Sequence, residues 1–549
     1  MAQLTGGEAV VQSLLNHGID TIFGLPGVQN DFLFNALYDA QDHIKVIHTR
    51  HEQGAAYMAF GAAIATGEPA VFSVVPGPGF LNAAAALSTA YALNEKVFAL
   101  VGQIPTDLIG KGEGVLHEIN DQLGMLRSLT KWAARATAPA QVPNLVAEAF
   151  RQLTSDRPRP VGLEVPMNVL KTRAEVDLEI SPGNPYAPPV DYGLLDQAAK
   201  VLGNAKNPMI YVGMGAFGAS EEIKNLAEML QAPVVGYRTG RGVLDYRHPL
   251  AHNLHGSHEL WKTADVVLAI GSNMRIPLQN WGTDSDMTVI RIDVDPTTHN
   301  LFKKPDIAIT ASAEASLPYL IEQTGAHNQS RPDRTDEMNQ VKAAWNQATA
   351  YLEPQSSYLK VIREALGEDG IFVDDLTQVG FAARMMYPVY KPRTYITPGY
   401  QGTLGYGYPT ALGVKVAKPD VPVISIAGDG GFMFSPQSLA TAVQHQISVV
   451  SIVFNNNMYG NVQQMQKGLY GGRVISSDLV NPDFVKMADA YGAKGLRAEN
   501  LDQLRTAIDE GLKTNGPTLI EVPMGTVESI DRLRKLPRIR GAAADIDVI

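Results

Sequence analysis

A short segment near the C-terminal end combines residue types that bind phosphate and magnesium. Gly428-Asp429-Gly430-Gly431 follows the apolar run 421–427, and Asn455-Asn456-Asn457 follows the apolar run 447–454. Glycine turns let backbone N–H groups approach an anion closely, and carboxylate and amide oxygens are hard ligands that suit Mg²⁺. Because Mg²⁺ seldom sits in an all-protein cage, a phosphate is expected to complete its octahedron. For the glycine turn alone, an ordinary strand-turn-helix with an asparagine cap is the alternative.

The spacing of these residues places them at one edge of a sheet. Asp429 and Asn456 lie 27 positions apart, and the strand, crossover and strand between them bring both to the carboxyl end of one parallel sheet. This order resembles the diphosphate motif of thiamine-diphosphate enzymes, in which GDG is followed one strand later by NN. The resemblance implies that Mg²⁺ is bound by Asp429, Asn456 and the carbonyl of Met458. It also implies that the diphosphate is surrounded by Gly430, Gly431, Tyr459 and Gly460.

A glutamate near the N-terminus could serve the other end of the same cofactor. The thiazolium C2 proton is removed by the cofactor's own aminopyrimidine when its N1′ atom is hydrogen-bonded to a carboxylic acid. Glu52 lies where an apolar run leads into an alanine-rich helix, and the segment 51–56, HEQGAA, resembles the activating-glutamate motif of acetolactate synthases. That resemblance implies that Glu52 is the acid for N1′. A solvated glutamate, favoured by the helix dipole, is the alternative.

A second glycine-rich stretch is expected beneath the rings of the cofactor. Residues 402–413, GTLGYGYPTALG, resemble the family's GxMGxxxPAAxG segment. The resemblance implies that Leu404 is the apolar wedge that bends the cofactor, and that the carbonyl of Gly402 accepts a hydrogen bond from the 4′-amino group. A plain core leucine is the alternative for Leu404.

An internal repeat relates the two ends of the chain. Residues 61–102 align without a gap on 413–454, at a constant offset of 352. Gly61 aligns with Gly413, whereas Asp429 aligns with Gly77, so only the second copy carries the acidic metal ligand. Two similar α/β domains are therefore predicted. Chance similarity between two β-α-β units is the alternative.

Two Pro-rich or polar stretches, 181–189 and 326–336, predict the domain boundaries. The predicted fold class is α/β, with three doubly wound parallel-sheet domains in sequence. The first and third share the thiamine-diphosphate-binding fold, and the middle one is Rossmann-like, with strands expected at 209–213, 266–271 and 289–293. The predicted domains are 1–182 for the pyrimidine, 190–326 in the middle, and 350–549 for the diphosphate and Mg²⁺.

The predicted middle domain contains a GxGxxG match. Gly213-Met-Gly-Ala-Phe-Gly218 follows a predicted strand directly, but a lone match is a weak signal. The acidic residue expected about 20 residues later in a dinucleotide-binding fold is absent, because Pro233-Val-Val235 stands there. The motif keeps an NAD-linked oxidoreductase open as a function of another class.

Composition limits the partners and the compartment. The chain has 549 residues, of which 45% are apolar, so more than one domain is expected. A net charge of −11 argues against a nucleic-acid or anionic-membrane partner, and the lack of cysteine excludes disulfides and thiolate catalysis. Every apolar stretch is interrupted before it reaches about 20 residues, and the N-terminus lacks a signal-peptide pattern, so we expect no membrane span and a cytoplasmic location.

Further motifs favour the acetolactate-synthase-like branch of the family. The segment 23–27, FGLPG, resembles the family's FGYPG; 76–79, PGPG, resembles SGPG; and 116–118, LHE, resembles FQE. Val75 stands where benzoylformate decarboxylases carry a catalytic histidine. In this family the site lies between the first domain of one subunit and the third of another, which implies a homodimer or homotetramer with sites between subunits.

Three positions depart from the biosynthetic acetolactate synthases. Asn273 replaces the substrate-binding arginine, Met465 stands where a tryptophan favours 2-oxobutyrate, and the segment from Val379 to Ala382 replaces the VGQH diphosphate segment. Together these departures weaken the case for bound FAD and for a role in branched-chain amino acid biosynthesis.

The substrate is expected in a largely apolar pocket with two polar groups. Around the reacting carbon we expect Val28, Gln29, His117 and Val379, with Met465 farther out. Such a pocket suits a small or aromatic 2-oxo acid, or an aldehyde. His117 could relay a proton or stabilise an alkoxide. For His117 the alternative is a partly exposed histidine in a polar loop. For Gln29, a functional and a structural role are likewise both possible.

These features predict an enzyme that depends on thiamine diphosphate and Mg²⁺ and makes or breaks carbon–carbon bonds of a 2-oxo acid. Decarboxylation followed by carboligation, as in acetolactate synthases, is the leading hypothesis. The alternatives are a non-oxidative 2-oxo acid decarboxylase and a benzaldehyde-lyase-like aldehyde lyase. A catalytically silent thiamine-diphosphate-binding subunit is a further possibility outside these activities.

Overall fold

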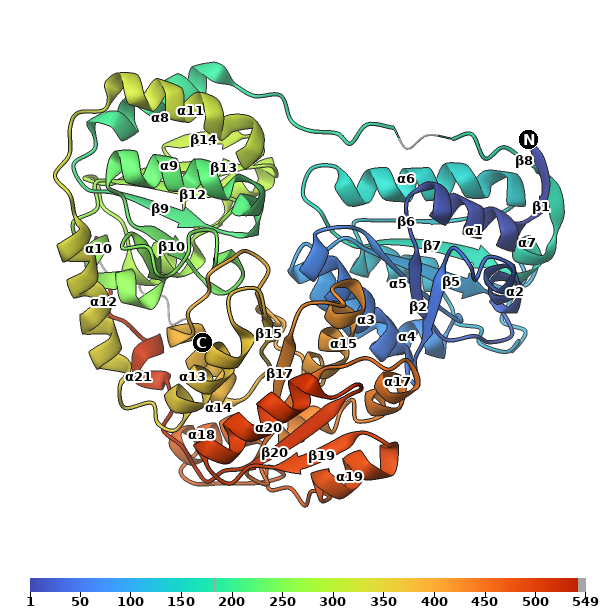
Figure 1. The fold of residues 1–549 in the computed structure, drawn as a ribbon. Coiled ribbons are helices and arrows are strands. Elements are labelled where there is room, and N and C mark those ends of the chain that lie inside the picture. The colour runs from blue at the N-terminus through green and yellow to red at the C-terminus, as the bar shows by residue number, and fades with distance from the viewer. Residues whose placement is uncertain (181–182, 542–549) are drawn as a thin grey trace. The chain divides into compact units, whose positions relative to one another are not determined.

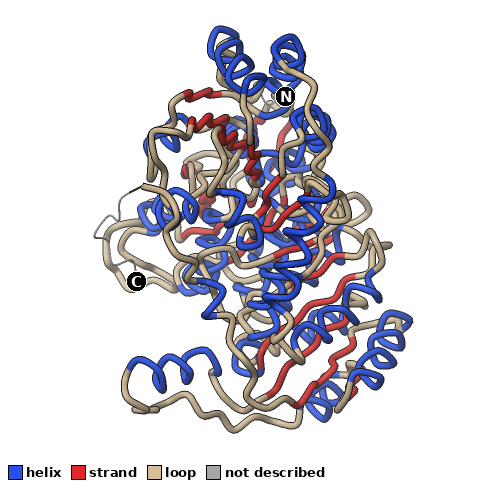
Figure 2. Tube along the Cα trace, turned by 90° about the vertical axis from the view of Figure 1, so that its left-hand side faces the viewer, coloured by secondary structure: helices blue, strands red, loops and turns tan. Residues whose placement is uncertain are grey.

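The chain forms two compact units, which a computed structural model describes for residues 1–180 and 183–541 (Figure 1). The first unit comprises Met1–Tyr186, Gly370–Thr377 and Ile396–Gly525. The second comprises Ala187–Asp369, Gln378–Tyr395 and Thr526–Ile549. Helices in blue cover both faces of the strands in red, the arrangement expected of doubly wound domains (Figure 2). The predicted domain boundaries stay predictions.

The N-terminal part of the first unit is built on a six-stranded sheet of order β3-β2-β4-β5-β7-β6. Its strands are β2 (Thr21–Gly24), β3 (Lys45–His48), β4 (Ala70–Val74), β5 (Val97–Gln103), β6 (Trp132–Arg135) and β7 (Val161–Pro166). Its helices are α1 (Gly6–Asn16), α2 (Asp31–Asp39), α3 (Glu52–Thr66), α4 (Pro78–Ala92), α5 (Gln122–Leu129), α6 (Val142–Thr154) and α7 (Met167–Lys171). β1 (Ala2–Thr5) pairs with β8 (Arg173–Val176) in a separate antiparallel ribbon. The central strands β4, β5 and β7 are buried along their whole length, as expected when helices cover both faces of a parallel sheet.

The C-terminal part of the first unit repeats this sheet, in the order β16-β15-β17-β18-β20-β19. Its strands are β15 (Ile371–Val373), β16 (Tyr395–Ile396), β17 (Val423–Gly428), β18 (Val450–Asn455), β19 (Lys494–Arg497) and β20 (Thr518–Pro523). Its helices are α15 (Gly407–Ala417), α16 (Asp429–Phe432), α17 (Ser438–Gln444), α18 (Gly460–Leu469), α19 (Phe484–Tyr491) and α20 (Leu501–Lys513). The two orders match strand for strand, which confirms the predicted similar domains. The crossover from β17 to β18 is split into α16 and α17, because Pro436 cannot continue the first helix.

The second unit contains the third six-stranded sheet, of order β11-β10-β9-β12-β13-β14. Its strands are β9 (Pro208–Val212), β10 (Val234–Gly236), β11 (Ala251–Asn253), β12 (Val266–Ile270), β13 (Thr288–Asp293) and β14 (Ile307–Thr310). Its α-helices are α8 (Tyr192–Asn204), α9 (Ser220–Leu230), α10 (His258–Trp261), α11 (Ala313–His327), α12 (Thr335–Thr349), α13 (Gln355–Leu366), α14 (Gln378–Met386) and α21 (Asp531–Arg534). All of its strand pairs are parallel, so the predicted Rossmann-like sheet is confirmed. Within 1–180 and 183–541, no helix has the length and apolar character needed to cross a membrane.

The core of the first unit is centred on a crossing of α3 and α15 (Figure 1). α3 is buried all round from Gly54 to Ala65, which is why its sequence is apolar on every face. A Cβ atom on Gly61 would lie 2.1 Å from the carbonyl oxygen of Thr410, and one on Gly413 would lie 2.0 Å from that of Met58. At the offset of 352, Met58 aligns with Thr410, so the two close contacts are copies of each other. The backbones can approach this closely only because both positions are glycine.

Replacing a crossing glycine should therefore destabilise the first unit. We expect Gly413→Ala to lower the free energy of unfolding by about 1–3 kcal/mol, because its methyl group overlaps a backbone carbonyl that cannot move aside. The matched control is Gly468→Ala in α18, where a Cβ atom meets nothing within 4 Å. That control should be stabilised by about 0.5–1 kcal/mol. Denaturant unfolding measures both, and equal stability of the two variants would contradict the crossing.

Buried histidines make the second unit sensitive to acid. His252 and His255 are 5% and 4% exposed, and each has one ring nitrogen without a hydrogen bond in the described structure. Burial lowers the pKa of His252 to about 3 and that of His255 to about 4, and the charges of Lys342 and Arg238 add to this effect. Both imidazoles are therefore neutral in the folded chain over the physiological range.

Thermal stability should consequently fall as the pH drops below about 6.5, the pKa of an unfolded histidine. Below that pH the unfolded chain binds protons that the folded chain excludes, so the loss continues down to the folded pKa values; above it these histidines have no effect. His252→Leu should flatten the dependence of the melting temperature on pH between about 8 and 5, whereas exposed His43→Leu should not. Identical pH profiles for the two variants would exclude this origin.

Candidate functional site

Asp429 is a buried carboxylate at the carboxyl end of β17. It is 2% exposed, and its carboxylate accepts hydrogen bonds from the backbone N–H groups of Gly430, Asn457 and Met458. The N–H of Met458 donates to Oδ2 at 3.2 Å. Burial raises the pKa of Asp429, and these amide hydrogen bonds partly oppose the rise. The glycine turn thus holds a carboxylate out of water among neutral donors.

The side chain of Asn481 completes this environment. Its Nδ2 atom lies 2.7 Å from Asp429 Oδ2, 3.0 Å from Asn455 Oδ1 and 3.2 Å from Asn457 Oδ1. Asn455 also donates from Nδ2 to Glu521, which turns its oxygen toward Asn481. The outer two asparagines of the triplet therefore contact Asn481. For Asn456, the described residues provide no side-chain hydrogen bond.

The donors of this site fit a divalent cation of the magnesium type. A buried carboxylate surrounded by neutral amides is best stabilised by a cation, and the neighbouring side-chain and backbone oxygens are hard ligands. In the described part of the chain, no group of three or more His, Cys, Asp or Glu side chains could hold a metal. One protein carboxylate is what Mg²⁺ uses when phosphate oxygens supply other ligands.

The glycines predicted to surround the diphosphate each lie close to another predicted site residue. A Cβ atom on Gly430 would lie 2.5 Å from the ring of Tyr459, and one on Gly431 would lie 3.7 Å from Leu404 Cδ2. Gly460 begins α18, and a Cβ atom there would be 3.3 Å from Asn456 Nδ2. Gly402 has a φ of 59°, a conformation that favours glycine. These contacts bring the predicted wedge, Leu404, to the glycine turn after β17.

Glu52 is the first residue of α3, immediately after β3 and a short loop. His51 caps the helix by accepting from the N–H of Gln53, which leaves the Glu52 side chain to project from the first turn. Its carboxylate accepts from Asn82 Nδ2 at 2.9 Å, and its side chain is 15% exposed. A Cβ atom on Gly79 would lie 3.5 Å from Glu52 Oε1. Glu52 is therefore packed against the start of α4 and is not the freely solvated glutamate of the alternative reading.

Gln29 and His117 are hydrogen-bonded to each other beside the same turn. Gln29 Oε1 lies 2.8 Å from His117 Nδ1, and Gln29 Nε2 donates to the carbonyl of Leu116 at 2.8 Å. The carbonyl of His117 packs on Gly77, where a Cβ atom would be only 2.4 Å away. The turn from Gly77 to Gly79 therefore contacts Glu52 at one end and His117 at the other.

A buried polar network holds this turn in place. Gln122, 1% exposed, accepts from the N–H of Gly77 at 2.8 Å and donates to Glu164 at 2.8 Å. Glu164 is fully buried and is paired with Arg135 at 2.7 Å. Sequence reasoning found none of Gln122, Glu164, Asn82 and Asn481, because a single polar residue in a strand, in a helix or before a proline resembles many structural residues.

The predicted substrate residues are less closely grouped. Val28 and Met465 are 51% and 49% exposed and lie on different elements, the loop after β2 and α18. Val379 is buried in α14, which belongs to the second unit. The first unit has an open pocket of about 680 Å³, which is lined by Leu81 and Glu118, the sequence neighbours of Asn82 and His117, but not by Asn82 or His117 themselves. Its lining residues are Leu81, Glu118, Ile119, Asn120, Asp121, Gly124, Met125 and Ser128.

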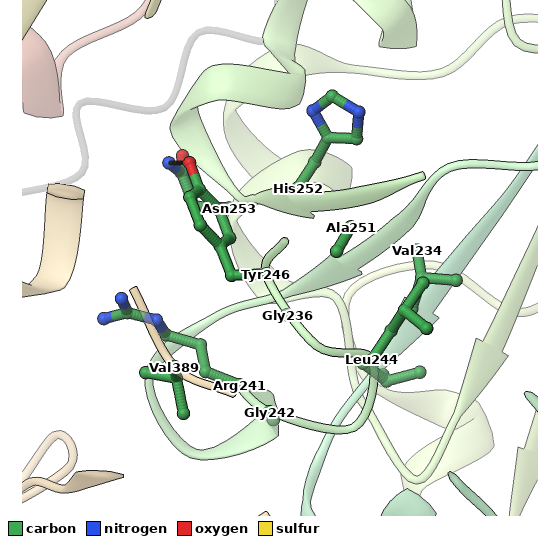
Figure 3. A pocket seen from close by; sticks show the side chains of 12 residues that line it. Val234, Gly236, Arg241, Gly242, Leu244, Tyr246, Ala251, His252, Asn253 and Val389 are labelled. Carbon is green, nitrogen blue, oxygen red and sulfur yellow. Dashed lines mark hydrogen bonds between the residues drawn. The ribbon is translucent and has the colours of Figure 1, made fainter. Parts of the chain in front are cut away.

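The glycine motif of the second unit is used for internal packing. Cβ atoms on Gly213 and Gly215 would collide with Gly271 at 2.0 and 2.9 Å, and one on Gly218 would meet the carboxylate of Glu314 at 2.1 Å. A carboxylate at this position would repel a phosphate group. A nearby pocket has a volume of about 20 Å³, enough for one water molecule; Figure 3 shows Tyr246 and Asn253 together on one side of it. These contacts give the NAD-linked alternative no support.

Comparison with known proteins matches most of the chain. Models described as thiamine pyrophosphate enzyme N-terminal TPP binding domain, central domain and C-terminal TPP binding domain match residues 4–125, 195–320 and 375–522. A "Probable 2-ketoarginine decarboxylase" of Pseudomonas aeruginosa is 33% identical, over 94% of each chain. Acetolactate synthase isozyme 3 large subunit of Escherichia coli is 31% identical, over 99% of this chain and 98% of that protein. A "Probable acetolactate synthase large subunit" of Methanocaldococcus jannaschii is 33% identical, over 96% and 93%.

Proposed function

The chain belongs to the thiamine pyrophosphate enzymes, in the branch that contains the acetolactate synthases, and we propose that it decarboxylates a 2-oxo acid and transfers the acyl carbanion to a second carbonyl compound. The observation that carries this proposal is the buried carboxylate of Asp429 among neutral amides at the ends of two adjacent parallel strands. Such a carboxylate suits a Mg²⁺ ion that links the protein to a diphosphate. In the proposed site, Asp429, Asn456 and the carbonyl of Met458 bind this ion.

The proposed roles of the other residues follow from their positions. When bound, thiamine diphosphate supplies a nucleophilic carbon and a sink for the electrons released by decarboxylation. The carboxyl group of Glu52 holds the proton shared with N1′, while Gly402 and Leu404 orient the rings. The diphosphate is surrounded by Gly430, Gly431, Tyr459 and Gly460.

The proposed substrate pocket combines apolar side chains with two polar groups. Val28 and Met465 supply apolar surface, and Gln29 and His117 supply the hydrogen-bonding groups. His117 moves protons at the oxygen atoms of the substrate. A small 2-oxo acid fits this chemistry, and FAD has no part in the proposed reaction.

A 2-oxo acid decarboxylase without carboligation is the second candidate. It is favoured by the relative from Pseudomonas aeruginosa, whose name describes a decarboxylase and whose similarity to this chain is as high as that of the synthases. The two activities share every step up to the loss of CO₂. They differ in what the remaining acyl group would then take up, a proton in the decarboxylase or a second carbonyl compound in the synthase.

The proposed assembly is a homodimer or homotetramer with sites between subunits, in the cytoplasm. Support for the assembly comes from large apolar side chains that are exposed near the predicted site residues, since such patches mark interaction surfaces. In the N-terminal part of the first unit these are Val28, Leu81, Leu116 and Met125. In its C-terminal part they are Met433, Phe434, Val462, Met465, Leu469 and Tyr470.

Product analysis tests the proposed function directly. With thiamine diphosphate and Mg²⁺, the enzyme should convert pyruvate to acetolactate and CO₂, as detected by mass spectrometry. Glu52→Gln should lower kcat by about 100-fold or more, because an amide cannot hold the acidic proton. Exposed Glu68→Gln is the matched control and should keep full activity.

The same assay distinguishes the candidates. Acetaldehyde without acetolactate, or turnover of 2-ketoarginine to its aldehyde alone, would favour the decarboxylase. If Glu52→Gln turns over as fast as the wild type while thiamine diphosphate still binds, the proposed role of Glu52 is wrong.

Titration of Mg²⁺ in the presence of thiamine diphosphate tests the metal site. Asp429→Asn should abolish measurable Mg²⁺ binding, because it removes the one carboxylate ligand. Asn481→Ala should weaken it by about 10- to 100-fold, because Asp429 and two asparagines lose the amide that orients them. Exposed Asn515→Ala is the control for Asn481. Calorimetry measures these affinities, and unchanged binding by Asp429→Asn would place the metal elsewhere.

A further inference from the structure

Gln29 is a buried side chain with a defined orientation. It is 3% exposed and lies in the loop between β2 and α2. Asn30 fixes this loop, since its side chain accepts from the N–H of Gly27 at 2.8 Å and donates to the carbonyl of Leu25 at 3.1 Å. The side-chain amide of Gln29 is therefore held by a loop that its own internal hydrogen bonds keep in one conformation.

The two hydrogen bonds of Gln29 determine which way its amide faces. The carbonyl of Leu116 can only accept, so the NH₂ group of Gln29 must point toward Leu116. Its oxygen then faces His117 Nδ1 at 2.8 Å. An oxygen acceptor at that distance requires a hydrogen on Nδ1. The neutral form of His117 therefore carries its proton on Nδ1 and has a lone pair on Nε2.

The backbone of His117 is held in an unfavourable conformation. Its φ is 69°, in the left-handed region that residues other than glycine adopt uncommonly. The carbonyl of His117 fits against Gly77, and the carboxylate of Glu118 accepts from the N–H groups of Gly112, Gly114 and Val115. Strain of this kind persists where the surroundings enforce it, and it concentrates at functional sites.

His117 is also close to the position proposed for the chemistry. Gly77, which contacts His117, caps α4, and Gly79 in the first turn of α4 contacts Glu52. The residue after His117, Glu118, lines the pocket of about 680 Å³ together with Leu81. An imidazole fixed beside the turn that also contacts Glu52 is placed to exchange protons with a substrate bound at that turn.

We propose that Gln29 is a positioning residue that fixes His117 as the Nδ1-protonated tautomer, so that Nε2 is the proton acceptor for the bound substrate. The proposal rests on the proposed function for the substrate step. In that step Nε2 takes the proton of a hydroxyl group as its carbon–oxygen bond becomes a carbonyl again, and the resulting imidazolium gives this proton to the oxyanion that forms when the carbonyl of the second substrate is attacked. Gln29 itself does not react; it selects the nitrogen that does.

The tautomer can be observed without any reaction. In the full chain labelled with ¹⁵N-histidine, long-range ¹H–¹⁵N correlation spectra distinguish the protonated from the unprotonated ring nitrogen, and His117→Gln identifies the signal. We expect Nδ1–H in the wild type. Gln29→Leu should return His117 to the Nε2–H form, while Gln29→Glu, whose carboxylate also accepts from Nδ1–H, should retain Nδ1–H. Exposed Gln41→Leu is the control.

Kinetics test the consequence for the reaction. Gln29→Leu should lower kcat by about 100-fold with little change in KM, and Gln29→Glu should recover most of kcat. Equal losses in the two variants, with the same rise in KM, would reveal a merely structural role and overturn the proposal. Circular dichroism of each variant excludes misfolding, and the Glu variant keeps the test decisive if the Leu variant does not fold.

The two proposals can fail separately. A wild-type His117 that is protonated on Nε2 overturns the role of Gln29, even if acetolactate is formed. An Nδ1–H tautomer that depends on Gln29, in a protein that processes no 2-oxo acid, supports the positioning role and overturns the proposed function.

Discussion

The close crossing of α3 and α15 is the constraint on which the rest of the first unit depends. Gly61 and Gly413 let each helix rest on a carbonyl of the other, and the internal repeat makes the two contacts equivalent. α3 begins at Glu52, and α15 follows the loop that carries Gly402 and Leu404. The crossing thus fixes the start of α3, where Glu52 lies, relative to the loop that carries Gly402 and Leu404. Any larger residue at either glycine would separate the helices and displace both.

The partners of Asp429 distinguish it from other buried carboxylates of the first unit. Glu164 and Glu521 are fully or almost fully buried, and each is paired with an arginine, Arg135 at 2.7 Å and Arg497 at 2.8 Å. Asp429 is equally buried, yet the donors to its carboxylate are amides. A paired carboxylate is already compensated, whereas the charge of Asp429 would be compensated by the Mg²⁺ ion of the proposed site. That difference, more than burial alone, supports the metal site proposed at Asp429.

Much of this arrangement could be predicted from the sequence. The strand runs, the gapless repeat and the GDGG segment are local patterns, so the three sheets, the paired domains and the place of Asp429 followed from them. The contacts of Asn481 and Gln122 could not be predicted, because they join segments distant in sequence and no periodicity marks them. The GxGxxG match misleads for the same reason: whether its glycines face a phosphate or Gly271 is decided by the neighbouring loop. The split of one crossover into α16 and α17 depended on Pro436, a signal that was present in the sequence.

The internal repeat also explains why the turn after β4 and the equivalent turn after β17 have different contacts. Gly77 and Asp429 occupy equivalent positions after β4 and β17, where the chain leaves the carboxyl end of a central strand. In the second copy this position carries a carboxylate directed at neutral amides. In the first copy the lack of a side chain, with a φ of 58°, admits the carbonyl of His117 and leaves the backbone N–H for Gln122. A side chain at Gly77 would displace His117 from Gln29, so glycine at the position that Asp429 occupies in the second copy is what makes room for the histidine.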